Sequence, residues 1–272
     1  MKKLIFLLLI STSLRAQKDT VYTSMEAALA HPERVHILSL AHKKLKELPA
    51  DIGKLIHLEA LDLSNNRLTA LPEEIGQLSE LKEINLFHNR LTSLPLGLGK
   101  LHHLQRLVLS SNRFTILPAV IGELDSLKEL SVKDNQLISL PDNIQNLANL
   151  KILSLSFNRL NKIPQGIGNL VKLEQLYLDH NDVQRLPPAF NNLKNLNTLS
   201  LEKNSLVEFP QAICELTQLH TLNLARSGYI GTLPSCLKNI EQLDVLVLDP
   251  NISMPFPGEF FHNAAIKIVV VQ

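Results

Sequence analysis

The chain has 272 residues, with 27 Lys and Arg against 26 Asp and Glu, no Trp, and 4% aromatic residues. Nucleic-acid binding normally uses a basic surface, and single-strand binding adds aromatic side chains that stack on the bases. The balanced charge and the few aromatic residues therefore argue against nucleic acid and give no sign of any other polyanionic partner.

Residues 1–16 have the order of a secretory signal peptide. Met1-Lys2-Lys3 precedes the apolar run from Leu4 to Ile10, and polar residues 11–13 lead to Ala16. We expect cleavage after Ala16, although Leu14 stands where a small residue is preferred. No apolar run in the chain approaches the length of about 18 residues that spans a bilayer, so no membrane span is expected.

The predicted signal peptide indicates an exported protein, located in a periplasm, on a cell surface or outside the cell. Its short basic start and the Ala16-Gln17 junction are typical of bacteria. Its removal leaves 24 basic and 26 acidic residues, a formal charge of −2, so the mature chain is also balanced.

Residues 17–34 are predicted to form an N-terminal cap. Thr23-Ser24-Met25-Glu26 reads as a capping box, in which a hydroxyl and a carboxylate satisfy the free N–H groups at a helix start. The short helix that it opens should run through Ala30 and end at His31-Pro32.

A 23-residue repeat fills most of the remaining chain. Its strongest marker is an asparagine that recurs at Asn66, Asn89, Asn112, Asn135, Asn158, Asn181 and Asn204. Ahead of the first of these, Leu61 and Leu63 alternate with more polar residues, which predicts a short strand with leucines inside. The asparagine amide suits the open backbone at the end of that strand. Prolines that lack an N–H, such as Pro72, belong outside the sheet.

The repeat resembles the leucine-rich repeat family, in the form whose coils carry Leu-Pro-x-x-Ile-Gly, as at 71–76. The resemblance covers residues 35–255 and implies an α/β solenoid, a horseshoe of about ten coils. A parallel β-sheet should line the concave face, with irregular or short helical segments on the convex side. The first coil has Lys43 in place of the asparagine, as suits a coil at the solvent-exposed end.

The last coils depart from the pattern. The ninth coil has one extra residue and its segment 228–234, Gly-Tyr-Ile-Gly-Thr-Leu-Pro, resembles the plant-type repeat. The tenth coil gives way to a Pro-rich turn and the apolar segment 266–271, which predicts a closing strand. Residues 256–272 are therefore interpreted as a C-terminal cap strand.

Cys214 and Cys236 are the two cysteines of the chain, and they lie in neighbouring coils. Coils stack at about 4.8 Å, so a disulfide is within reach, and an export route would permit it. The two residues are offset by two positions within their coils, however, and a pair of small buried thiols is the alternative.

Two groups of residues interrupt the small polar side chains of the predicted concave face. The coil 3–4 cluster contains Phe87, Arg106 and Val108. The coil 6–8 cluster contains more charge and two aromatic rings: Phe157, Tyr177, Asp179, His180, Glu202 and Lys203. Exposed aromatic residues ringed by polar groups often anchor protein interfaces, although such rings also pack simply on their neighbours.

The repeat contains no recognisable catalytic arrangement. There is no Gly-x-Ser-x-Gly elbow, no complete phosphate-binding loop and no set of metal ligands with suitable spacing, so neither enzyme activity nor a cofactor or metal is predicted.

The favoured function is a non-enzymatic scaffold that binds a protein on its concave face. One alternative is the recognition subunit of an effector enzyme whose catalytic part is on another chain. Another is a self-associating envelope or surface protein, which an open edge on the last strand would favour. The sequence leaves the partner and the oligomeric state open.

Overall fold

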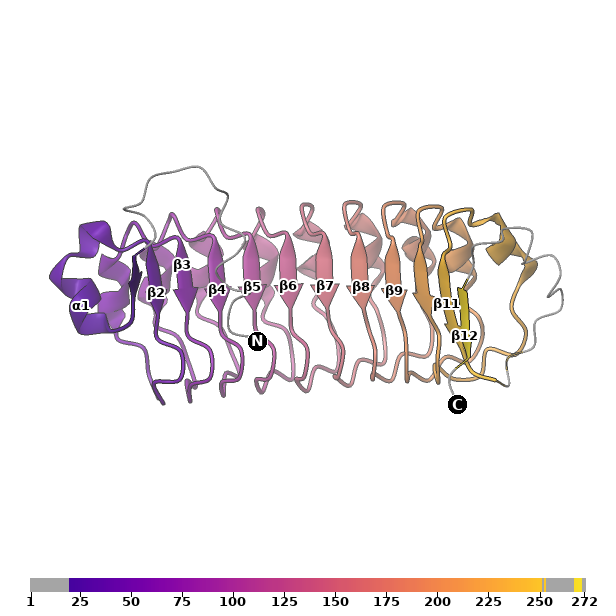
Figure 1. The fold of residues 1–272 in the computed structure, drawn as a ribbon, viewed down its shortest axis with the longest axis horizontal. Helices are drawn as coiled ribbons and strands as arrows, with labels where there is room; N and C mark the ends of the chain where they lie inside the picture. Colours follow the sequence, from indigo (N-terminus) through magenta and orange to yellow (C-terminus); the bar gives the residue numbers. More distant parts are fainter. Residues whose placement is uncertain (1–19, 251, 253–266, 271–272) are drawn as a thin grey trace.

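The computed structural model describes residues 20–250, 252 and 267–270, so the predicted signal peptide lies outside the described residues. The chain forms an elongated solenoid in which one parallel sheet of 12 strands follows the order of the sequence (Figure 1). The strands are β1 (Val21–Tyr22), β2 (Ile37–Ser39), β3 (Ala60–Asp62), β4 (Glu83–Asn85), β5 (Arg106–Val108), β6 (Glu129–Ser131), β7 (Ile152–Ser154), β8 (Gln175–Tyr177), β9 (Thr198–Ser200), β10 (Thr221–Asn223), β11 (Val245–Leu248) and β12 (Lys267–Val270). The predicted leucine-rich repeat solenoid is thus confirmed.

Short 3-10 helices cover the convex side, one in each of coils 1 to 9. They are η2 (Ala50–Lys54), η3 (Glu73–Gln77), η4 (Leu96–Lys100), η5 (Ala119–Glu123), η6 (Asp142–Asn146), η7 (Gln165–Asn169), η8 (Pro188–Asn192), η9 (Gln211–Glu215) and η10 (Ser235–Asn239). A proline in extended conformation precedes each helix, for example Pro72 before η3. Its missing N–H costs nothing there, because the first N–H groups of a helix have no partner within it.

The core lies between the sheet and these helices. Most apolar residues of the pattern are fully buried, as Leu61, Leu63, Leu68, Ile75 and Leu78 show for the second coil, while Leu45 and Leu186 are partly buried. Each coil is too thin to enclose them alone, so the leucines of adjacent coils pack into one continuous cluster along the solenoid.

The asparagine column connects consecutive coils. Nδ2 of Asn66 donates to the carbonyl oxygens of Leu40 at 2.8 Å and Leu63 at 2.9 Å, and its Oδ1 accepts from the N–H of Leu45 at 2.9 Å. The other six asparagines repeat this pattern, with bonds to the coil before and to their own coil. Buried backbone groups at the bend are thereby satisfied, as the sequence predicted.

Successive 3-10 helices pack with an offset of two positions. A Cβ atom on Gly76, the fourth residue of η3, would lie 2.3 Å from the carbonyl oxygen of Gly97, the second residue of η4. Gly168 in η7 and Ala189 in η8 stand in the same relation. At Gly76 and Gly168, the next coil approaches so closely that no side chain fits, which explains the glycine of the Ile-Gly pair.

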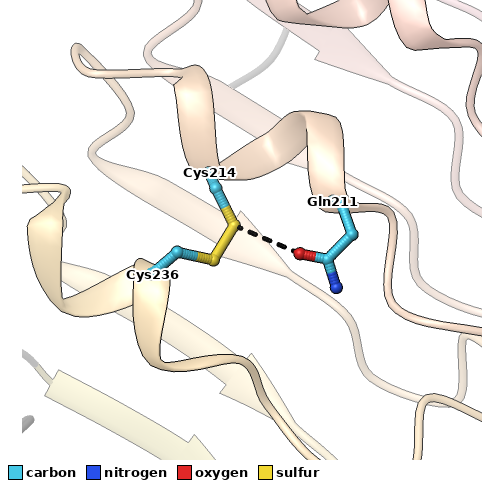
Figure 2. Close-up of a disulfide and its surroundings, with 3 residues drawn as sticks. All are labelled: Gln211, Cys214 and Cys236. Carbon is cyan, nitrogen blue, oxygen red and sulfur yellow. Dashed lines mark hydrogen bonds between the residues drawn. A yellow bond between two sulfur atoms is a disulfide. The ribbon is translucent and has the colours of Figure 1, made fainter.

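Cys214 and Cys236 occupy these same two places in η9 and η10. A disulfide joins them, with their Cα atoms 5.6 Å apart (Figure 2). In the sequence, the offset of two positions counts against the pairing. The convex helices stack with this same offset, so it brings the two cysteines together. The bond therefore connects the eighth and ninth coils on the convex side.

The ninth coil lacks the asparagine, and backbone hydrogen bonds connect it to the eighth coil instead. Ser227 takes the asparagine position, and its carbonyl oxygen accepts from the N–H of Leu206 at 2.7 Å. Tyr229 N–H then donates to the Leu206 carbonyl at 2.7 Å, and Leu206 forms a parallel bridge with Gly228. Gly228 has a φ of +119°, and a Cβ there would meet the Leu206 backbone. This is the physical reason for the changed motif.

Both ends of the sheet carry additional elements. Helix α1 (Met25–Ala30) begins at Ser24, whose Oγ accepts from the N–H of Ala27 at 3.2 Å, and η1 (Pro32–Arg34) follows it. At the other end β12 pairs with β11 along all four residues. Within the described residues, no helix has the length and apolar character needed to cross a membrane.

Candidate functional site

The concave face carries the coil 6–8 cluster on strands β7 to β9 and the turns that follow them. Tyr177 is half-buried in β8, and its hydroxyl donates to Oε1 of Gln175 at 3.1 Å. It stands in register with Ser154 and Ser200 on the neighbouring strands. Because both neighbours are small, the tyrosine ring projects beyond them on this part of the sheet.

The residue before each asparagine has a left-handed backbone. This holds at Asn65, His88, Ser111, Asp134, Phe157, His180 and Lys203, and also at His42 and Arg226, where Lys43 and Ser227 replace the asparagine. Asn and Asp tolerate this conformation well, whereas a bulky residue such as phenylalanine is unusual there. Phe157 therefore occupies its place at a backbone cost.

Phe157 and His180 form an aromatic stack. Their ring centroids are 4.0 Å apart and their planes differ by 15°. Lys133 from the preceding coil places its Nζ 5.0 Å from the centroid of Phe157. Even so, 43% of the Phe157 surface stays exposed. The three side chains come from coils 5, 6 and 7; Phe157 and His180 belong to the left-handed row, and Lys133 directly precedes its member Asp134.

Asp179 organises this site. Its Oδ2 accepts from Ser156 Oγ at 2.9 Å, and its Oδ1 accepts from Ser200 Oγ and from the Glu202 N–H, the latter at 3.2 Å. Glu202 in turn accepts from Asn223 Nδ2 at 3.3 Å. Since both carboxylate oxygens of Asp179 are engaged, we assign it to positioning the turns beside the stack. The sequence did not predict Lys133 as a site residue. It lies 24 residues before Phe157, in the adjacent coil, and that spacing could have indicated the contact.

The coil 3–4 cluster is less coherent. Phe87 is 39% exposed and lies tilted against His88, with centroids 5.9 Å apart. Arg106 instead pairs with Glu129 on the next strand, with Nε 3.1 Å from Oε2. Val108 lies in register with Asn85, and no cation–π contact links Arg106 to Phe87 in the described part of the chain.

Glu83 lies beside Arg106 on the concave face. Burial raises the pKa of its carboxyl above the ordinary value, Arg106 opposes the rise, and Glu129 adds to it. A raised pKa means that the fold disfavours the ionised form of this acid. Its contribution to stability is therefore greatest below the ordinary range for glutamate and is lost as the pH rises through the raised value.

Neither metal nor cofactor chemistry is indicated by the described residues. They contain no group of three or more His, Cys, Asp or Glu side chains arranged to hold a metal ion. A hollow of about 330 Å³ beside strands β7 to β10 is partly filled by the Lys151–Glu174 ion pair, with 2.7 Å between Nζ and Oε1. The exposed stack is thus the feature best suited to a macromolecular contact.

Comparison with known proteins places this geometry in context. A family profile described as "Leucine-rich repeat region" matches residues 29–111, 95–183 and 165–255. A leucine-rich repeat protein of Leptospira interrogans is 28% identical over 93% of this chain and 82% of its own, with a TM-score of 0.71. Among curated proteins, no sequence matches significantly.

Two further solved structures share the solenoid. The ectodomain of the plant membrane receptor kinase GASSHO1/SCHENGEN3 from Arabidopsis thaliana, in complex with CASPARIAN STRIP INTEGRITY FACTOR 2, is 32% identical over 83% of this chain, with a TM-score of 0.72. This chain spans 28% of that ectodomain. An internalin of Listeria monocytogenes shares the fold at 19% identity, over 89% of this chain and 84% of its own, with a TM-score of 0.62.

Proposed function

The chain belongs to the leucine-rich repeat family, and from this premise we propose that it is an exported, non-enzymatic scaffold that binds a protein on its concave face. The contact surface would be the coil 6–8 cluster with Lys133 added. Asp179 would hold the turns in place, while Phe157, His180 and Tyr177 would contact the partner.

The stack of Lys133, Phe157 and His180 carries this proposal. Phe157 stands in a row of the repeat where Asn, Asp and His fit the backbone better, so local conformation does not account for its ring. Aromatic and cationic side chains with partial exposure are the groups that most often dominate binding energy at protein interfaces. The plant ectodomain in complex with a named factor supports the use of this fold for such contacts.

The export part of the proposal rests on residues 1–16 and on the disulfide. Disulfides form and persist mainly in oxidising compartments outside the cytosol, and the bond between Cys214 and Cys236 fits that setting. The self-associating alternative required an open edge on the last repeat strand. In the structure β12 pairs with β11 along its full length, so the edge of the sheet lies at β12 and not at the last repeat strand.

The test uses substitutions that the repeat itself supplies. Phe157→Asn introduces the residue found at the same place in coil 2, and Tyr177→Ser introduces the residue found in coils 6 and 8. We expect the double variant to fold with a Tm within about 3 °C of the parent. Because Asn tolerates the left-handed backbone at residue 157 better than Phe does, the Phe157→Asn change should raise the free energy of unfolding by up to about 1 kcal/mol.

Binding is measured by capture from secreted and envelope fractions, identification by mass spectrometry, and reconstitution with the purified partner. The parent and a Phe87→Ala control should bind that partner, and the Phe157→Asn/Tyr177→Ser variant should not. Equal binding by a folded double variant would exclude this surface. Unfolding of the double variant would instead assign both rings to packing.

A further inference from the structure

One long edge of the first four coils is strongly basic. Segments 40–49, 63–72, 86–95 and 109–118 run from the end of each strand to the following proline, and they contain six Lys or Arg residues and one Glu. The rest of the same coils, segments 50–62, 73–85, 96–108 and 119–131, contains ten Asp or Glu and five Lys or Arg. The near-neutral charge of the whole chain conceals this separation.

The basic side chains form a row, which we name the basic edge: Lys43, Lys44, Lys46, Arg67, Arg90 and Arg113. All six are exposed. They lie in the segments that follow the arrowheads of β2 to β5, which line one long edge of the solenoid (Figure 1). The three arginines hold the same repeat position, directly after the asparagine.

The spacing of this row is fixed by the backbone. Arg67 N–H donates to Leu45 at 2.7 Å, Arg90 N–H to Leu68 at 2.9 Å, and Arg113 N–H to Leu91 at 2.9 Å. Each position is thereby tied to the coil before it. At about 4.8 Å per coil, the row from Lys44 to Arg113 extends about 15 Å.

The charges of the basic edge are not neutralised within the protein. No ion pair among the described residues involves any of the six, whereas elsewhere cations such as Lys82, Arg106 and Lys151 pair with carboxylates on the next coil. Glu47 is the single acid in these segments. Unpaired like charges at coil spacing repel one another, so a partner that supplies anions would stabilise this arrangement.

We propose that the basic edge binds a linear sulfated polysaccharide. Arginine presents a planar fork of donors that matches oxyanions, and a row at fixed spacing suits a chain that carries many of them. Single exposed ion pairs are weak, so binding needs several at once, which a polymer provides. Each arginine also has an exposed threonine two residues later, Thr69, Thr92 or Thr115, whose hydroxyl suits hydrogen bonding to sugar.

Other anionic polymers fit the edge less well. Single-stranded nucleic acid is held by a series of stacked aromatic rings, and the four edge segments contain one exposed phenyl ring, Phe87, beside the imidazoles of His42 and His88. A bilayer is a plane, whereas the arginines contribute one side chain per coil along a line. The row lies on coils 1 to 4, so it does not include the stack on coils 5 to 7.

Heparin serves as the probe, with chemically desulfated heparin as its control. The test compares the purified chain with Arg67→Gln/Arg90→Gln/Arg113→Gln and with Lys54→Gln/Lys100→Gln/Lys172→Gln, which removes the same charge from exposed positions elsewhere. We expect the arginine variant to lose affinity about tenfold or more, and the slope of log affinity against log salt to fall by about three. The lysine control should change affinity less than about twofold.

Three results would overturn the proposal. They are equal heparin binding by the arginine variant with an unchanged Tm, equal binding of desulfated heparin, or tighter arginine-dependent binding to phosphatidylglycerol vesicles or single-stranded DNA. The Phe157→Asn/Tyr177→Ser variant should keep full heparin affinity. Failure of the basic edge and failure of the concave site are therefore separate outcomes.

Discussion

At the scale of single residues, the asparagine column contributes hydrogen bonds that hydrophobic packing cannot replace. Asn158 donates to Val132 and Leu155 and accepts from Leu137, so one side chain satisfies backbone groups in two coils. Its surroundings are buried, and any group left without a partner there loses its hydration as well.

We therefore expect Asn158→Leu to lower the free energy of unfolding by about 1 to 3 kcal/mol. Chemical denaturation followed by circular dichroism measures this change. Asn161→Leu in the same coil is the matched control, because Asn161 is exposed, and it should leave the midpoint nearly unchanged. Equal midpoints for both variants would contradict the hydrogen-bonding role of the column.

The residue scale also separates what the sequence predicted from what it did not. The role of Asn66 followed from its spacing and chemistry, since a strand end needs both a donor and an acceptor. The left-handed backbone at Phe157 did not follow, because the sign of φ leaves no trace in the hydropathy pattern. Asp179 was predicted to contact a partner, yet hydrogen bonds that no pattern reveals engage both its oxygens.

At the scale of elements, the packing of the convex helices fixes which positions must be small. We expect Gly168→Ala to destabilise the chain by about 1 to 3 kcal/mol, because its Cβ would lie 2.3 Å from the carbonyl oxygen of Ala189. Gly166→Ala in the same helix is the control, because its nearest neighbour, Cβ of Gln145, is 3.0 Å away. Thermal unfolding compares the two, and a larger loss for Gly166→Ala would refute the packing argument.

This offset also explains why the sequence alone does not distinguish a disulfide from a pair of buried thiols. Aligning coils by their prolines places Cys214 at the fourth position after one proline and Cys236 at the second after the next. The distance between them depends on how one 3-10 helix slides past another, which a sequence alignment does not contain. The strands, by contrast, were predictable because alternation determines their inner face.

At the scale of the whole molecule, contacts run only between neighbouring coils, so stability varies along the axis. The disulfide closes a loop of about 22 residues and should contribute about 3 kcal/mol by restricting the unfolded chain. We expect Cys214→Ser/Cys236→Ser to lose that stability mainly in coils 8 and 9.

Hydrogen exchange resolved along the chain measures this effect. Amide protection should fall in β9 and β10 while β3 to β7 keep theirs, because each coil depends on its neighbours rather than on a common core. Reduction of the parent protein should reproduce the result. A uniform loss of protection along the sheet would show instead that the solenoid unfolds as one unit.

The 23-residue repeat has a mechanical consequence. A chain held by its two ends and stretched would release one coil at a time, since no contact spans more than adjacent turns. Every regular coil contains the same number of residues, so each release would lengthen the chain by a similar step of about 80 Å. The eighth and ninth coils would yield a shorter step, because the bond between Cys214 and Cys236 withholds the residues that it encloses.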